Sequence, residues 1–125
     1  MTPFGARLRQ LRQARGVEQK DMAAALGVSA SYLSALEHGR RGKPTWAMIQ
    51  KIIGYFNVIW DEAEDLQRLA EISDPRVVVD TVNLTPEATA LANHLAARIR
   101  TLSPEQIAAM QAVLDQPAEA ASKKL

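Results

Sequence analysis

The segment QKDMAAALGVSASYLSALE, residues 19–37, decides how the first half of this chain folds. Its first part is alanine-rich, and three apolar residues lie on one helical face: Met22, Ala23 and Leu26. Gly27 ends this helix, because glycine takes the left-handed backbone conformation without strain. Ser29 is a good N-cap for a second helix over about residues 29–37, in which apolar side chains again recur at helical spacing. The segment therefore predicts two short helices joined at a corner.

A turn of three or four residues that contains glycine sets two such helices at a sharp angle, as in a helix-turn-helix. Val28 supplies an apolar side chain for the corner between them. The second helix of this motif is shaped to enter the major groove of DNA. We therefore expect the helix that begins near Ser29 to contact a DNA duplex.

Charge is distributed unevenly along the chain, although its formal net charge is only +1. Residues 1–60 hold nine basic and three acidic side chains, for a net charge of +6, whereas residues 61–125 have a net charge of −5. This asymmetry suggests that the first half binds a polyanion. The alternative is that surface charge differs between the halves without a functional reason.

The rest of the first half predicts three further helices that pack against this pair. One is expected at about residues 3–14 and another at about residues 60–71. The third begins after Thr45, which is its expected N-cap. Each has apolar residues at helical spacing, and Pro3 suits a first helical turn. The expected first domain is therefore an all-α, five-helix globule over residues 1–72.

The second half predicts one strand and two helices. The β-branched run RVVVDTVNL, residues 76–84, is the only stretch typical of a strand. Thr85 with Pro86, and Ser103 with Pro104, then signal two helix starts. Residues 73–116 are expected to form a short β-strand followed by a helical hairpin, and residues 117–125 a disordered tail.

Several segments of the first half together resemble a known family. LRQLRQARG precedes QKDMAAALGVSASYLSALEHG, and a basic loop ending in KP leads into WAMIQKIIGYFNV. This text is similar to the phage repressor and Cro type of helix-turn-helix, the XRE family, over about residues 4–58. The resemblance implies a lambda-repressor-like DNA-binding domain.

The resemblance also implies roles for individual residues. Family members hold backbone phosphates with a glutamine at the start of the second helix and with a basic loop, which here gives Gln19, Lys20, Arg40, Arg41 and Lys43. Positions that reach base edges or nearby phosphates correspond to Ala30, Ser31, Tyr32, Ser34 and Ala35. Arg12 and Glu37 match a family pair that ties the first helix to the end of the third, so their expected role is structural.

Two of the expected base-reading positions are alanine, which makes no bidentate hydrogen bond to a base. Specificity is therefore expected to depend on DNA shape, half-site spacing and water-mediated contacts. Tyr32 either packs its ring on the second helix or faces DNA. Other residues have a structural alternative to DNA contact: Arg7, Arg9, His38 and Trp46. Trp60 is expected in the core or at an interface.

The second half is expected to build a homodimer. A lone strand leaves backbone groups unpaired, and the same strand of a second copy is the simplest partner. The helical hairpin also has more apolar surface than it can hide by itself. The expected dimer residues are Val77, Val79, Leu91, Leu95 and Ile99. The alternative is that residues 76–115 fold back on the DNA-binding domain.

These observations favour a sequence-specific regulator of transcription, a dimeric repressor that reads a palindromic operator in double-stranded DNA. An antitoxin-like autoregulator, whose acidic second half binds a protein toxin, is the alternative. An enzyme is not expected, because cysteine is absent and neither metal-ligand spacing nor a glycine-rich phosphate loop occurs. We expect no cofactor. No apolar run of about 18 residues occurs, and the segment MTPFGARLRQ lacks the apolar region of a signal peptide, so we expect a cytoplasmic, nucleoid-associated protein without a membrane partner.

Overall fold

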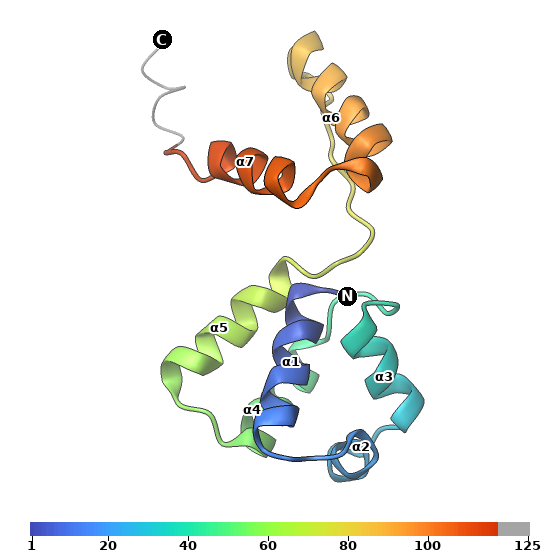
Figure 1. Cartoon of the computed structure of the whole chain (residues 1–125), viewed down its shortest axis with the longest axis vertical. Coiled ribbons are helices and arrows are strands. Elements are labelled where there is room, and N and C mark those ends of the chain that lie inside the picture. The colour runs from blue at the N-terminus through green and yellow to red at the C-terminus, as the bar shows by residue number, and fades with distance from the viewer. Residues whose placement is uncertain (118–125) are drawn as a thin grey trace. The chain divides into compact units, whose positions relative to one another are not determined.

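The computed structural model describes residues 1–117, and within that range the regular secondary structure is all helical (Figure 1). The chain divides into two compact units, Met1–Val78 and a second unit that begins at Val79. Among the described residues, no helix is both long and apolar enough to cross a membrane.

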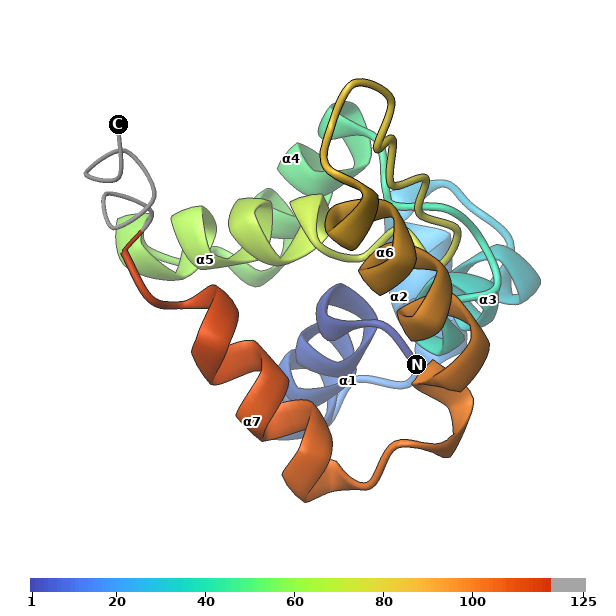
Figure 2. The ribbon, with the colours of Figure 1, turned by 90° about the horizontal axis from the view of Figure 1, so that it is seen from above.

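The first unit contains five helices that surround one apolar core: α1 Pro3–Ala14, α2 Gln19–Leu26, α3 Ala30–His38, α4 Trp46–Phe56 and α5 Trp60–Glu71. Helix α1 packs against both α3 and α5 and lies between them in Figure 1. Helices α4 and α5 run beside each other, as Figure 2 also shows. Every helix contributes to the core, whose largest buried side chains include Phe4, Phe56, Leu8, Met22 and Leu33. The predicted all-α fold of this part is confirmed.

Local hydrogen bonds explain where these helices begin and end. Thr2, Ser29 and Thr45 each accept a bond from a backbone N–H three residues later, at 3.0–3.1 Å, and so cap α1, α3 and α4. Gly27 follows α2 with φ 74° and Gly39 follows α3 with φ 73°, the left-handed conformation that glycine accepts most readily. The starts of α1, α3 and α4 and the ends of α2 and α3 therefore follow from residues close in sequence.

Two tertiary contacts close the first unit around α1. Ser73 is buried just beyond α5, where its Oγ accepts a hydrogen bond from the backbone N–H of Phe4 at 2.9 Å and donates one to the carbonyl of Leu69. A Cβ at Gly5 would overlap the backbone carbonyl of Glu37, so α1 and α3 approach backbone to backbone at this glycine. Ser73 thus belongs to the first unit by its contacts, and the predicted boundary after residue 72 stays a prediction.

The predicted strand at residues 76–84 is wrong, since no strand occurs among residues 1–117. Its valines are exposed, and the backbone follows local turns instead. The Asp80 carboxylate accepts a bond from the N–H of Val82 at 2.9 Å, and Asn83 adopts φ 67°. β-Branched residues favour an extended backbone, but a strand also needs a neighbouring strand to bond with. This part of the chain provides none.

The second unit contains α6 Pro86–Arg98, the short 3₁₀ helix η1 Ile99–Thr101 and α7 Pro104–Leu114. Ser103 and Gln106 form a capping box at the start of α7, with bonds of 2.9 and 3.1 Å. No residue of α6, η1 or α7 is buried. The predicted disordered tail, residues 117–125, lies outside the described residues except for Pro117.

Candidate nucleic-acid interface

Helix α3 has a buried face and an outward face, and its sequence explains both. Leu33 and Leu36 lie in the core. The expected base-reading positions lie elsewhere on the helix, where Ala30 and Ser31 are exposed and Ser34 and Ala35 are half-buried. These four side chains are small, so neither charge nor bulk blocks the outward face.

Tyr32 differs from the other expected base readers. It is half-buried and packs against the apolar core. The guanidinium carbon of Arg41 lies 5.2 Å from its ring centroid. The structure therefore places a loop arginine over the ring of Tyr32, a contact that the spacing of the two residues did not indicate.

The loop after α3 carries the expected phosphate-binding residues Arg40, Arg41 and Lys43, all exposed. None of the three forms an ion pair with a described residue. The loop leaves α3 at a defined angle, because Gly39 is left-handed and the N–H of Arg40 donates to the carbonyl of Ala35 at 3.0 Å. Three cations therefore project beside α3 without local neutralisation.

The start of α2 provides backbone donors together with Gln19 and Lys20. Its N-cap, Glu18, makes no side-chain capping bond. The Glu18 carbonyl accepts from the N–H groups of Asp21 and Met22 at 3.1 Å, whereas Gln19 and Lys20 lie in the first turn, where helix N–H groups lack intrahelical partners. Such groups attract anions. Lys20 also lies 3.6 Å from the Glu18 carboxylate in an exposed ion pair.

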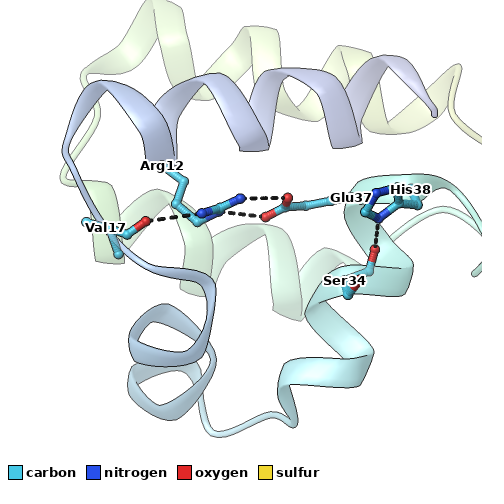
Figure 3. A network of polar contacts seen from close by, with 5 residues as sticks. All are labelled: Arg12, Val17, Ser34, Glu37 and His38. Carbon is cyan, nitrogen blue, oxygen red and sulfur yellow. Dashed lines mark hydrogen bonds and ion pairs between the residues drawn. The ribbon is translucent and has the colours of Figure 1, made fainter.

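Arg12 and Glu37 come together between α1 and α3 (Figure 3). Arg12 Nε donates to Glu37 Oε2 at 2.9 Å and its Nη2 to Oε1 at 3.1 Å, a bidentate pair. Arg12 Nη1 also donates to the carbonyl of Val17 at 3.2 Å. The Glu37 side chain is 1% exposed, so the pair faces the interior. It orients α3 relative to α1 and to the chain entering α2.

The residues with structural alternatives are placed as follows. His38 Nδ1 lies 2.8 Å from the Ser34 carbonyl, so this ring bonds to its own helix (Figure 3). Trp46 and Trp60 are both exposed, at the starts of α4 and α5. Arg7 is half-buried and Arg9 exposed on α1.

The expected dimer residues are mostly uncovered within this chain. Val77, Val79, Leu91 and Ile99 are exposed, and Leu95 is half-buried. A hollow of about 220 Å³ in the second unit lies between residues of α6 and α7, and its apolar lining is Leu91, Leu95, Leu102 and Met110. Within residues 1–117, no cluster of histidine, aspartate and glutamate side chains could hold a metal ion.

Comparison with known proteins identifies the same part of the chain. Residues 3–66, about half of the sequence, match the family described as helix-turn-helix domain. The curated relatives include three proteins of Bacillus subtilis strain 168. The chain is 38% identical over 61 residues to the uncharacterized HTH-type transcriptional regulator RghRB. The aligned residues make up 49% of this chain and 44% of RghRB.

Two further relatives match over a similar span. The HTH-type transcriptional repressor RghR is 42% identical over 52 residues, 42% of this chain and 38% of the relative. The uncharacterized HTH-type transcriptional regulator YazB is 39% identical over 59 residues, 47% of this chain and 84% of YazB. The chain therefore spans less than half the length of RghRB and RghR.

Proposed function

This chain belongs to the helix-turn-helix domain family, and we propose from this that it is a sequence-specific regulator of transcription. In this proposal it binds double-stranded DNA with α3 in the major groove. We further propose that it acts as a dimeric repressor on a palindromic operator.

The observation that carries the proposal is the surface around α3. Its outward face presents the small side chains of Ala30 and Ser31, which allow close approach to a groove. The cations of Arg40, Arg41 and Lys43 project beside it with no acidic partner among the described residues. An α-helix fits the major groove of B-DNA. The phosphates on either side of the groove would then pair with the three cations.

The two sets of residues would contribute different terms to binding. Contacts from Gln19 and the basic loop to phosphates position the protein on any sequence, whereas contacts to base edges distinguish sequences. Alanine at position 30 offers only apolar contact, for example with a thymine methyl group, and serine at 31 bonds to several bases. We therefore expect much of the specificity to come from DNA shape and from the spacing of two half-sites, about 34 Å apart.

Mapping of bound DNA across the genome, followed by binding assays on the recovered sequence, tests this proposal. Arg41→Ala should weaken binding to all duplexes, whereas Ser31→Ala should change the preference at one base pair. Affinity of the unmodified protein should fall by orders of magnitude between about 50 and 200 mM salt if six or more phosphates are contacted. Binding that is absent at low salt would contradict the proposal. Equal losses on all sequences for both variants would remove Ser31 from the base readers.

We assign dimerisation to the second unit as part of this proposal. Helices α6 and α7 bury no residue, although Leu91, Ile99 and Ile107 are large and apolar. Exposed apolar surface of this kind favours association, and a two-fold axis is the commonest symmetry. Two DNA-binding units on one duplex also gain affinity through effective concentration.

Sedimentation compares the full chain with a chain truncated after Val78, which retains Ser73 and its bond to Phe4. The full chain should sediment as a dimer and the truncated chain as a monomer. A truncated chain that still dimerises would exclude the second unit as the dimer device. A monomeric full chain that purifies with a small basic protein would instead favour the antitoxin-like alternative.

A further inference from the structure

Tyr32 and Arg41 form a contact that links α3 to the loop that follows it. The Arg41 guanidinium lies over the ring face of Tyr32, 5.2 Å from its centroid. The ring of Tyr32 packs against the core, and its backbone N–H donates to Ser29 Oγ at 3.0 Å, the bond that caps the start of α3. The core therefore supports the ring as a platform in the first turn of a capped helix.

The neighbouring cations lack such a platform. Arg40 and Lys43 are exposed like Arg41. Within residues 1–117, however, the cations that lie over an aromatic ring are Arg41, over Tyr32, and Arg15, over Phe56. An arginine that lies on a ring uses its flat face, so the N–H groups at its edge stay free to donate. Those edge groups are the ones that bind phosphate oxygens in bidentate geometry.

We infer that Tyr32 is a positioning residue for Arg41, and that its ring holds the guanidinium ready for one DNA phosphate. This inference rests on the proposed function and assigns Tyr32 a role different from the predicted base reading. A free arginine loses much side-chain conformational entropy when it is fixed on a ligand. The ring restricts the side chain before DNA arrives, and preorganisation of this kind strengthens binding.

A double-mutant cycle on DNA affinity tests the inference. Binding to a fluorescein-labelled duplex of mixed sequence is measured by anisotropy at low salt for the unmodified protein and for Tyr32→Phe, Tyr32→Leu and Arg41→Gln. Tyr32→Phe keeps the ring and should keep its coupling to Arg41, whereas Tyr32→Leu should weaken binding about two- to fivefold, the range typical of an exposed cation–π contact. In the Arg41→Gln background, Tyr32→Leu should cause no further loss.

Arg40→Gln is the matched control, because it removes an adjacent exposed arginine that does not lie on a ring. In that background Tyr32→Leu should weaken binding by the same factor as in the unmodified protein. Arg41→Gln should also lower the slope of log affinity against log salt by about 0.9, as expected for one lost phosphate contact. Equal effects of Tyr32→Leu in the Arg41→Gln and Arg40→Gln backgrounds would overturn the inference.

A second measurement does not depend on DNA. Protons that lie over an aromatic face are shifted upfield, so the side-chain δ protons of Arg41 should resonate upfield in the free protein and in Tyr32→Phe, and return to ordinary values in Tyr32→Leu. Tyr32→Met replaces the leucine variant if the latter loses its helical circular dichroism. Ordinary δ-proton shifts in the unmodified protein would overturn the contact itself. Shifted protons in a protein that ignores DNA would instead refute the proposed function and, with it, the role in phosphate binding.

Discussion

Replacing Arg12 with methionine should lower the free energy of unfolding of the first unit by about 3–5 kcal/mol, because it leaves a buried carboxylate without its partner. The Glu37 side chain is 1% exposed and receives two hydrogen bonds from Arg12, at 2.9 and 3.1 Å. Among the described residues these are its only side-chain bonds. Methionine fills a similar volume but donates nothing.

The reverse substitution should be less harmful. Glu37→Leu leaves Arg12, whose side chain is 16% exposed and still donates to the Val17 carbonyl at 3.2 Å. Its guanidinium can therefore reach water, and we expect a loss of about 1–2 kcal/mol. The double variant Arg12→Met/Glu37→Leu removes both charges and should lie close to the unmodified protein, since apolar pairs often replace buried ion pairs at little cost.

Urea unfolding followed by circular dichroism measures these differences. For a small domain, a loss of about 4 kcal/mol lowers the midpoint by on the order of 2 M urea. The reasoning is refuted if Arg12→Met costs less than about 1 kcal/mol, since a buried unpaired carboxylate cannot be that cheap. It is also refuted if the double variant loses the sum of the two single losses, because residues in contact should couple.

Substitutions at three further positions test the packing around α1 and the turn before α3. Gly5→Ala should destabilise the first unit by at least about 3 kcal/mol, since a new Cβ would overlap the Glu37 carbonyl and lie 2.9 Å from that of Leu36. Thermal unfolding measures the loss, and a variant of unchanged stability would show that α1 and α3 can move apart at little cost in free energy. Ser73→Ala should cost about 1–3 kcal/mol, because it leaves the buried N–H of Phe4 without an acceptor, and amide hydrogen exchange at Phe4 should accelerate; unchanged exchange there would contradict the assigned bond. Gly27→Ala should lower the free energy of unfolding by only about 1–2 kcal/mol, since its Cβ meets open space and only the φ of 74° is unfavourable. Gly27→Asn should lower it less, because asparagine accepts the left-handed conformation more readily than alanine. Equal losses of stability for both variants would argue against a conformational cause.

The amino-acid sequence determined the helices because their limits depend on residues a few positions apart. The sequence predicts N-caps at four positions, and each side chain accepts a hydrogen bond from the backbone N–H three residues later: Ser29, Thr45, Thr85 and Ser103. Gly27 was expected to end α2, and it does so in the left-handed conformation. Resemblance to a known family added the roles expected at individual residues, including the DNA contacts that the experiments above test.

The tertiary structure decided what depends on residues far apart in the chain. Ser73 accepts a hydrogen bond from the N–H of Phe4, 69 positions away in the chain, and the sequence around either residue does not predict that bond. The valines near residue 78 favour an extended backbone, yet strand formation needs a partner strand that this part of the chain does not provide. The position of Arg41 over Tyr32 likewise depends on the path of the loop. Caps and periodicity act within a few residues, whereas packing, strand pairing and ring contacts depend on where the folded backbone brings distant groups together.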